Sequence, residues 1–278
     1  MTTHVTGLDH VVICVHDLER ARSTYARLGF TLTPRGHHSL GSQNHCIMFG
    51  SDYIELLAVP KAHPANQYFT DFLQGGDGLA AIALATDDAR AALAAFRRGG
   101  IEAAAPLDFS RPVQVGAETR DARFRIVQLP VAQTPGCRAF LCQHFTRELV
   151  WQPENQSHAL GATGLAALAV VVEDPEPAAR AYARLFAATP RHIEEGLLVE
   201  TGTAPIALAT RWKLGHRLHG VALPLRSRPL VAALFIRVAD RARAAQALRK
   251  GGFSPVALAD GSYAVGADHA HGVALVFG

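Results

Sequence analysis

The chain has 278 residues, of which 49% are hydrophobic and 18% are charged, so it is long enough for two domains and apolar enough to bury a core. The formal net charge is +3 and the 27 basic residues are scattered, which excludes a nucleic-acid-binding stripe and a polybasic membrane patch. No segment has the pattern of a signal peptide or of a membrane span, so we expect a cytoplasmic protein with no membrane partner.

Four segments of similar pattern recur along the chain. They read GLDHVVICVHD ending at Asp17, GLAAIALATDD ending at Asp88, GLAALAVVVED ending at Asp174 and LVAALFIRVAD ending at Asp240. Each apolar run predicts a β-strand. Each aspartate predicts the N-cap of a helix, because its carboxylate accepts hydrogen bonds from the free N–H groups of the first helical turn.

The stretch after each aspartate has a helical composition, and in the first copy Leu18, Ala21 and Tyr25 fall on one face. Glycines near the end of the stretch suit a left-handed C-cap. A second strand is predicted to begin thirteen residues after each aspartate, at Phe30, Ile101, Ala187 and Phe253. Further short strands, such as residues 45–49 and 53–59, complete a βαβββ unit.

The longest gap between copies contains a polar, glycine-containing stretch at residues 153–163, where we place a domain boundary. The first domain is predicted at residues 1–155, with units at 7–60 and 78–147. The second is predicted at residues 156–278, with units at 164–210 and 230–278. The fold class is therefore α+β, with four βαβββ units. The cysteines are widely spaced, which favours free thiols over a disulfide framework.

Several motifs of the first half follow this repeat. They are Leu8-Asp9-His10, Gly36-His37-His38, Tyr53-Ile54-Glu55-Leu56 and the segment 142–151. Together they resemble the vicinal-oxygen-chelate superfamily, and specifically its glyoxalase-like family, which shares its fold with bleomycin resistance proteins and dioxygenases. The resemblance implies that paired units form two half-open β-barrels. It covers the first domain well and the second in fold only.

In this superfamily the metal ligands lie on the first and fourth strands of each unit and point into the barrel. The first-strand position lies seven residues before each shared aspartate and holds His10, Ala81, Ala167 and Ala233. Many members of the superfamily have a histidine where Ala81 stands here. This departure argues against a standard four-ligand glyoxalase site and against a standard extradiol dioxygenase site.

The resemblance places the fourth-strand ligand of the first unit at Glu55. An ionisable group inside an apolar strand costs free energy unless it is paired, hydrogen-bonded or bound to a metal. An alignment of Tyr53 with Phe140 puts the corresponding position of the second unit at Cys142. His144 lies two residues further on, on the same face of the strand.

The expected metal ligands are therefore His10, Glu55 and His144, with Gln143 as the alternative to His144 on the opposite face of its strand. Two imidazoles and one carboxylate suit a divalent Fe, Mn, Zn, Ni or Co ion, and non-haem Fe(II) oxygenases use the same set. Glu55 is also the predicted catalytic residue, as a base that leaves the metal.

The expected substrate-binding residues are His37 and Asn44, which match the family, and Arg123 and Arg125 as partners of an anion. His38 and His45 are interpreted as surface groups. The leading hypothesis is a metal-dependent enzyme acting on an oxygen-chelating small molecule, by lyase or isomerase chemistry or as a ring-cleaving dioxygenase. The alternative is a metal-free protein that binds or sequesters a drug or metabolite. The oligomeric state stays open, with a homodimer as one option.

Overall fold

The structure is a computed structural model that describes residues 3–227 and 229–278. Its first half contains two βαβββ units. Unit 1 comprises β1 (Gly7–Cys14), α1 (Leu18–Arg27), β2 (Gly36–His37), β3 (Gln43–Met48) and β4 (Tyr53–Ala58). Unit 2 comprises β5 (Gly78–Ala85), α3 (Ala89–Arg98), β6 (Leu107–Val115), β7 (Glu118–Gln128) and β8 (Arg138–His144).

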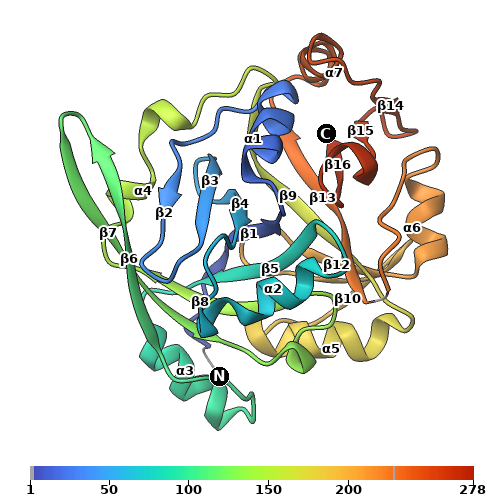
Figure 1. Cartoon of the computed structure of the whole chain (residues 1–278). Helices are drawn as coiled ribbons and strands as arrows, with labels where there is room; N and C mark the ends of the chain where they lie inside the picture. Colours follow the sequence, from blue (N-terminus) through green and yellow to red (C-terminus); the bar gives the residue numbers. More distant parts are fainter. Residues whose placement is uncertain (1–2, 228) are drawn as a thin grey trace.

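The second half repeats this order of elements, and the predicted α+β fold of four βαβββ units is confirmed (Figure 1). Unit 3 comprises β9 (Ala162–Val171), α5 (Pro175–Phe186), β10 (Arg191–Ile193), β11 (Gly196–Val199) and β12 (Ile206–Ala209). Unit 4 comprises β13 (Leu230–Val238), α7 (Arg241–Lys250), β14 (Val256–Ala257), β15 (Tyr263–Val265) and β16 (Ala274–Phe277).

A short helix follows the last strand of three of the units. These helices are α2 (Gln67–Leu73), α4 (Arg147–Val150) and α6 (Arg211–Arg217). Single 3₁₀ turns occupy Pro64–Asn66, Val131–Gln133, Pro153–Asn155 and Ala267–His269. Within the described residues, no helix has the length and apolar character needed to cross a membrane.

The shared aspartates lie at equivalent junctions between strand and helix, as predicted. The carboxylates of Asp17, Asp88, Asp174 and Asp240 each accept a hydrogen bond from a backbone N–H in the first turn of the following helix. Each satisfies a donor that the helix itself leaves free. The repeat seen in the sequence is therefore a repeat of one local structure.

The end of each helix differs from the prediction. Phe30 does not begin a strand: its N–H donates back to the carbonyl of Tyr25 at 3.2 Å, after Gly29 has turned into the left-handed region with φ of 95°. The same backbone bond closes the helices before Ile101 and Phe253. These residues are the apolar positions of helix C-cap motifs, and the second strand begins several residues later.

In the third copy, the left-handed residue that ends the helix comes one residue later than in the other copies. Ala187, which the alignment paired with Phe30, is itself the left-handed residue, with φ of 50°, and it caps the longer helix α5. The ungapped alignment of the four copies is therefore wrong at this point. An alanine is strained in this left-handed conformation, where a glycine would not be, because its Cβ crowds the backbone.

The strands form two eight-stranded sheets of the same topology. The order is β2-β3-β4-β1-β5-β8-β7-β6 in the first and β10-β11-β12-β9-β13-β16-β15-β14 in the second. In each unit the first strand pairs in parallel with the last, and the first strands of paired units lie antiparallel at the centre. A hydrogen bond from Ser39 N to Ser110 O links the two ends of the first sheet, which is nearly closed into a barrel.

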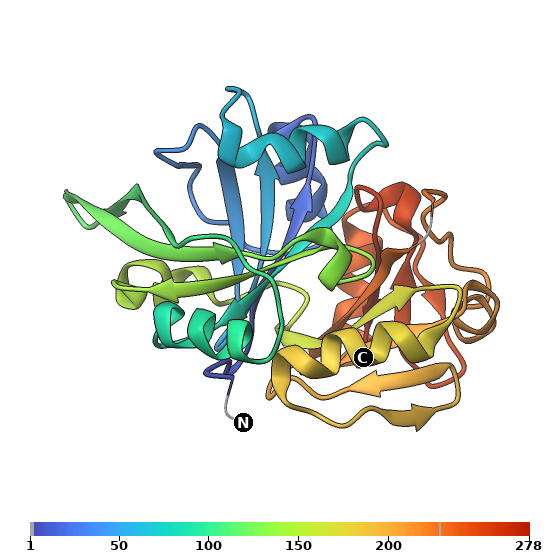
Figure 2. The same cartoon turned by 90° about the horizontal axis from the view of Figure 1, so that it is seen from below.

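The two halves of the chain lie side by side (Figures 1 and 2). Equivalent tyrosines connect them: the hydroxyl of Tyr25 in α1 donates to Ala270 O, and that of Tyr182 in α5 donates to Pro135 O. One apolar core includes buried residues of the strands and long helices of both halves. The division of the chain at residue 155 stays a prediction. The cysteines are buried free thiols, as expected.

Candidate active site

The first sheet curls around an internal cavity of about 70 Å³. Because side chains alternate along a strand, every second side chain of each strand points into this cavity. The apolar lining includes Val12, Tyr53, Leu57, Phe109, Phe124, Ile126 and Phe140. A polar group of four side chains interrupts this lining, namely His10, His38, Asn44 and Glu55. A few polar groups in an apolar cavity are typical of a small-molecule site.

His10 lies on β1 and is 3% exposed. Its ring stacks on Tyr53, with centroids 4.3 Å apart, and meets the edge of Phe140 at 5.6 Å. Its Nδ1 lies 2.7 Å from Oδ2 of Asp9, the preceding residue. Neighbours on a regular strand point to opposite faces, but the pairing of β1 with β5 shifts between Leu8 and His10. This β-bulge lets Asp9 approach the ring of His10.

The contact with Asp9 determines where His10 carries its proton. The pKa of Asp9 is lowered because hydrogen bonds from His10 and His144 outweigh the effect of burial, which acts to raise it. An ionised carboxylate only accepts, so Nδ1 of His10 is the donor. In the neutral ring, Nε2 then offers its lone pair to the cavity, 3.6 Å from Oε2 of Glu55.

Glu55 lies on β4, with a side chain that is 8% exposed. Its Oε1 accepts a hydrogen bond of 2.6 Å from Nδ2 of Asn44 on β3. The same oxygen lies 3.8 Å from Nε2 of His38. The carboxylate thus stands between two imidazoles, and Asn44 holds its orientation from the third side.

His38 is a member of this group that sequence reasoning assigned to the surface. Its side chain is 8% exposed, and its ring meets Phe109 edge to face at 5.4 Å. Burial lowers the pKa of His38 to about 4, so the ring is neutral at pH 7. Its Nδ1 lies 2.8 Å from the hydroxyl of Ser42, and Nε2 faces Asn44 and Glu55. The G-x-H motif was the available signal, since its histidine is His38.

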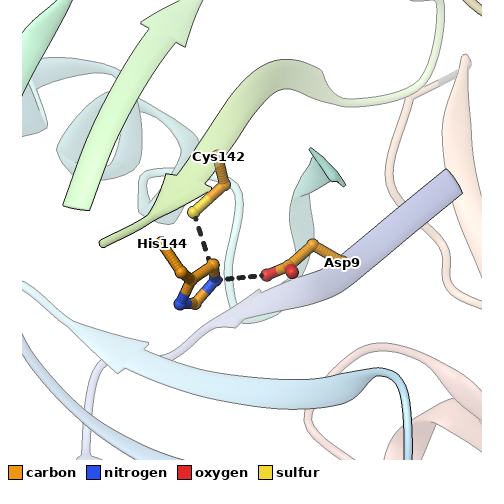
Figure 3. A group of neighbouring side chains, drawn as sticks. All are labelled: Asp9, Cys142 and His144. Carbon is orange, nitrogen blue, oxygen red and sulfur yellow. Dashed lines mark hydrogen bonds and ion pairs between the residues drawn. The ribbon is translucent and has the colours of Figure 1, made fainter. Parts of the chain in front are cut away.

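His144 occupies a different place from the one predicted. Its Nε2 lies 2.9 Å from Oδ2 of Asp9 and 3.6 Å from Sγ of Cys142, as Figure 3 shows. In the part of the chain that the structure describes, one group of three metal-binding residue types (His, Cys, Asp or Glu) has all its ligand atoms within 4.8 Å of one another. This group is Asp9, Cys142 and His144. His144 therefore stands behind His10, joined to it through Asp9, and not beside Glu55.

Gln143 points away from this group, as the alternation along β8 predicts. Its amide oxygen accepts from Ala89 N and its amide nitrogen donates to Asp87 O, so it secures the start of α3. The Nδ1 atom of His144 is buried without a hydrogen-bond partner. Because Nε2 faces the ionised Asp9, Nε2 carries the ring proton. In this rotamer Nε2 therefore has no lone pair with which to bind a metal.

The observed strand pairing corrects the alignment that led to His144. Tyr53 pairs with His10 on β1, whereas the residue that pairs with Ala81, the counterpart of His10, is Arg138. The counterpart of Tyr53 is therefore Arg138 and not Phe140. Two residues further on, Phe140 becomes the counterpart of Glu55. The second unit thus places alanine and phenylalanine where the first places histidine and glutamate.

The second sheet is apolar at all four equivalent positions. The same register relates His10 to Ala167 and Ala233, and it relates Glu55 to Ala207 and Val276. None of these side chains can bind a metal. The polar group of the first barrel therefore has no counterpart in the second at these positions.

Of the predicted substrate-binding residues, only Asn44 lines the cavity. His37 is exposed at the barrel edge. Arg123 and Arg125 point outward from β7, and Arg125 pairs with Asp108 at 2.6 Å. The residues that point inward on this strand are Phe124 and Ile126. A shift of one position along a strand reverses its face, which the sequence did not reveal for this hairpin.

The cavity arginines are instead Arg111 on β6 and Arg138 on β8. Arg138 lies 4.0 Å from the centre of the Tyr68 ring and donates to Gln128 at 3.3 Å. Burial lowers the pKa of Arg138. Arg111 is 6% exposed. Neither was identified from the sequence, because nothing local separates them from the many other arginines.

Comparisons with known proteins agree with this architecture. A family model described as a glyoxalase-like domain matches residues 8–186. A hypothetical protein from Staphylococcus aureus has a similar structure, with a TM-score of 0.68 at 12% identity over 98% of each chain. No curated protein matches the chain.

Two further structures resemble parts of this arrangement. A xylose isomerase-like TIM barrel/4-hydroxyphenylpyruvate dioxygenase fusion protein matches with a TM-score of 0.55 at 16% identity, over 92% of this chain and 40% of that chain. Methylmalonyl-CoA epimerase from Mycobacterium tuberculosis is 23% identical over 51% of this chain and 91% of that chain, with a TM-score of 0.39. At their low identities the Staphylococcus aureus protein and the fusion protein show the fold alone, which is the vicinal-oxygen-chelate fold. Because the family model spans more than half of its length, the chain belongs to the glyoxalase-like domain family.

Proposed function

We propose that this protein is a metal-dependent enzyme of small-molecule metabolism, with its site in the first barrel. The observation that carries the proposal is the pair formed by His10 Nε2 and Glu55 Oε2, which face each other at 3.6 Å inside a largely apolar cavity. Two consecutive units build that cavity around them. A bound cation would complete this arrangement, because it pairs with the buried carboxylate and accepts the imidazole lone pair.

The residues fit a divalent ion. Metal–ligand distances of about 2.0–2.2 Å put neighbouring ligand atoms about 3.0–3.6 Å apart, and the 3.6 Å between His10 Nε2 and Glu55 Oε2 agrees with this spacing. Asp9 accepts from the other nitrogen of His10, an arrangement that orients metal-binding histidines. We propose His38 as the third ligand, because its Nε2 faces Glu55 Oε1 at 3.8 Å. The ligand atoms of His10, His38 and Glu55 do not all lie within 4.8 Å of one another, so the His38 ring would have to move toward His10 to bind the same ion. The prediction that His144 is a ligand requires its ring to turn away from Asp9.

A bound ion would supply Lewis acidity toward an oxygen of the substrate. The chain's own residues would do the rest. Glu55, held by Asn44, is placed to take a proton from a carbon or oxygen beside the polarised group. The apolar walls exclude water from this step. Lyase or isomerase chemistry and ring-cleaving dioxygenation both use such a site, and Fe, Mn, Zn, Ni and Co all suit its donors.

The test is metal binding by untagged protein, measured by elemental analysis and by calorimetric titration with Mn²⁺ and Zn²⁺. His10→Ala should lose the metal and stay folded. The matched control is His45→Ala, which removes a buried histidine of β3 whose Nδ1 bonds to Thr33 O outside the cavity. His38→Ala and His144→Ala decide the third ligand. If His10→Ala binds metal as wild type does and melts much lower, His10 has a structural role and the proposal fails.

One observation favours a second candidate, a metal-free binding protein. The positions that complete the metal site in the second unit hold Ala81 and Phe140, so half of the superfamily's ligand positions are apolar. A protein of this kind would bind its ligand equally well before and after treatment with a chelator. Metal-free purified protein that takes up no added Mn²⁺ or Zn²⁺ would favour this function.

A further inference from the structure

Arg111 is a buried cation without a partner. It lies in the middle of β6, is 6% exposed and lines the cavity. Within the described residues, the side chain of Arg111 has no hydrogen bond and no ion pair. Arg125 on the next strand, in contrast, donates two hydrogen bonds to the carboxylate of Asp108. None of the nitrogen atoms of Arg111 is among the fully buried polar atoms without a partner, so an anion in the cavity can reach them.

The cavity offers no such anion from the chain itself. Glu55 is the one carboxylate among the lining residues, and its contacts are with His10, His38 and Asn44. Arg111 and Arg138 together therefore leave the cavity with one excess positive charge, and a bound divalent ion would add two more. An enclosed site with this charge selects an anionic ligand.

The walls beside Arg111 indicate what the anion is attached to. Phe109 lies two residues from Arg111, on the same face of β6, and stacks on Phe124 with centroids 5.0 Å apart. Ile126 and Phe140 continue this surface toward His10. Flat apolar walls of this kind suit an aromatic or branched body.

We propose that the cavity binds a small organic acid with an aromatic or branched apolar body, and that Arg111 binds its carboxylate through paired N–H···O bonds. The body packs on Phe109 and Phe124. A second oxygen function of the ligand reaches the polar group around His10 and Glu55. Only this last contact rests on the proposed metal-dependent function.

Arg138 is the competing cation of the cavity. Its guanidinium already has neutral partners in Gln128 and Tyr68, although its Nε is buried without a hydrogen bond. These partners hold it at the end of the cavity covered by α2. Arg111 has no comparable support, which is why we assign the carboxylate to it.

The experiment is calorimetric titration of the full chain with phenylacetate and with its neutral isostere phenylacetamide, before and after removal of metal by a chelator. Phenylacetate should bind wild type at least tenfold more tightly than the amide. Arg111→Met should weaken phenylacetate by about 10- to 100-fold, since a charge-assisted pair is lost, and leave the amide unchanged. Arg111→Lys should restore part of the loss.

Arg123→Met is the matched control, because it removes the same charge from the outer face of the neighbouring strand. Thermal melting without ligand gives an independent measurement. Arg111→Met should melt close to wild type, since the Arg111 side chain makes no hydrogen bond or ion pair that the variant would lose. Phenylacetate should raise the melting temperature of wild type and not that of Arg111→Met.

Equal binding of acid and amide by wild type would overturn the proposal, and so would the absence of saturable phenylacetate binding. Undiminished binding by Arg111→Met would also overturn it, as would a loss confined to Arg138→Met. These outcomes are separate from the metal site. If chelator-treated protein needs Arg111 to bind the acid and takes up no added Mn²⁺ or Zn²⁺, the metal-dependent function fails while the anion site stands.

Discussion

Asp9→Asn tests how the metal site is oriented. The carboxylate is 2% exposed, and its Oδ2 accepts from His10 at 2.7 Å and from His144 at 2.9 Å. Both bonds end on the same oxygen, so the amide oxygen of asparagine can take its place and accept from both rings, but without the negative charge. The proton of His10 is then no longer held on Nδ1 by an ionised partner and can move to Nε2.

The expected magnitudes follow from these contacts. Conversion of two buried charge-assisted hydrogen bonds into neutral ones should cost about 2 kcal/mol of stability. Arg147 adds little, because its contact with Asp9 is 3.5 Å long and its side chain is 49% exposed. If His10 moves its proton to Nε2, it loses the lone pair that a metal needs. We therefore expect metal affinity to fall by about 10- to 100-fold.

The assay is calorimetric titration of Asp9→Asn with Mn²⁺ and Zn²⁺, together with its thermal melting. Asp52→Asn is the control, because Asp52 is another buried aspartate of the same barrel that accepts from Leu165 N. The asparagine oxygen keeps that bond, so metal affinity should match wild type. A folded Asp9→Asn protein with wild-type metal affinity would refute the tautomer argument.

Three further predictions concern pH, the junction between the halves and the missing ligand position. His158 accepts from Thr31 N and bonds to Met48 O, and burial lowers its pKa; below pH 6.5 the unfolded chain therefore binds more protons, and stability should fall as the pH drops. His158→Gln should flatten that slope in thermal melts, and an unchanged slope would contradict this. Tyr25→Phe and Tyr182→Phe should each cost about 0.5–1.5 kcal/mol in unfolding experiments, because equivalent hydroxyls lose equivalent bonds; strongly unequal losses would count against their equivalence. Phe140→His should tighten Mn²⁺ or Zn²⁺ binding in calorimetry, since it puts an imidazole at the counterpart of Glu55; unchanged affinity would contradict the register argument.

The repeat was readable from the sequence because its signals are local. A capping aspartate, an apolar helix face and a left-handed glycine each act within a few residues, so they survive in each copy. The start of the second strand was misplaced for a related reason. Phe30 is apolar whether it begins a strand or closes a helix, and only its bond to Tyr25 O distinguishes the two.

The site was readable in part. His10 and Glu55 were identified from a motif and from the cost of an acid within an apolar strand, and the structure brings their side chains to 3.6 Å. The partners of this pair were not. Whether His38 is buried depends on β6 and Phe109, which come some seventy residues later in the chain.

The sequence by itself determined the four units, their caps and the first pair of polar residues, since each depends on spacing along one strand or helix. Only the tertiary structure decided the strand register between units. This register makes Phe140 the counterpart of Glu55, places Arg111 inside the cavity and places Arg125 on the outer face of the barrel. Register depends on pairing between distant strands, and a shift of one residue turns every side chain to the other face. The bulge at Asp9 has the same origin, because it exists only where β1 meets β5.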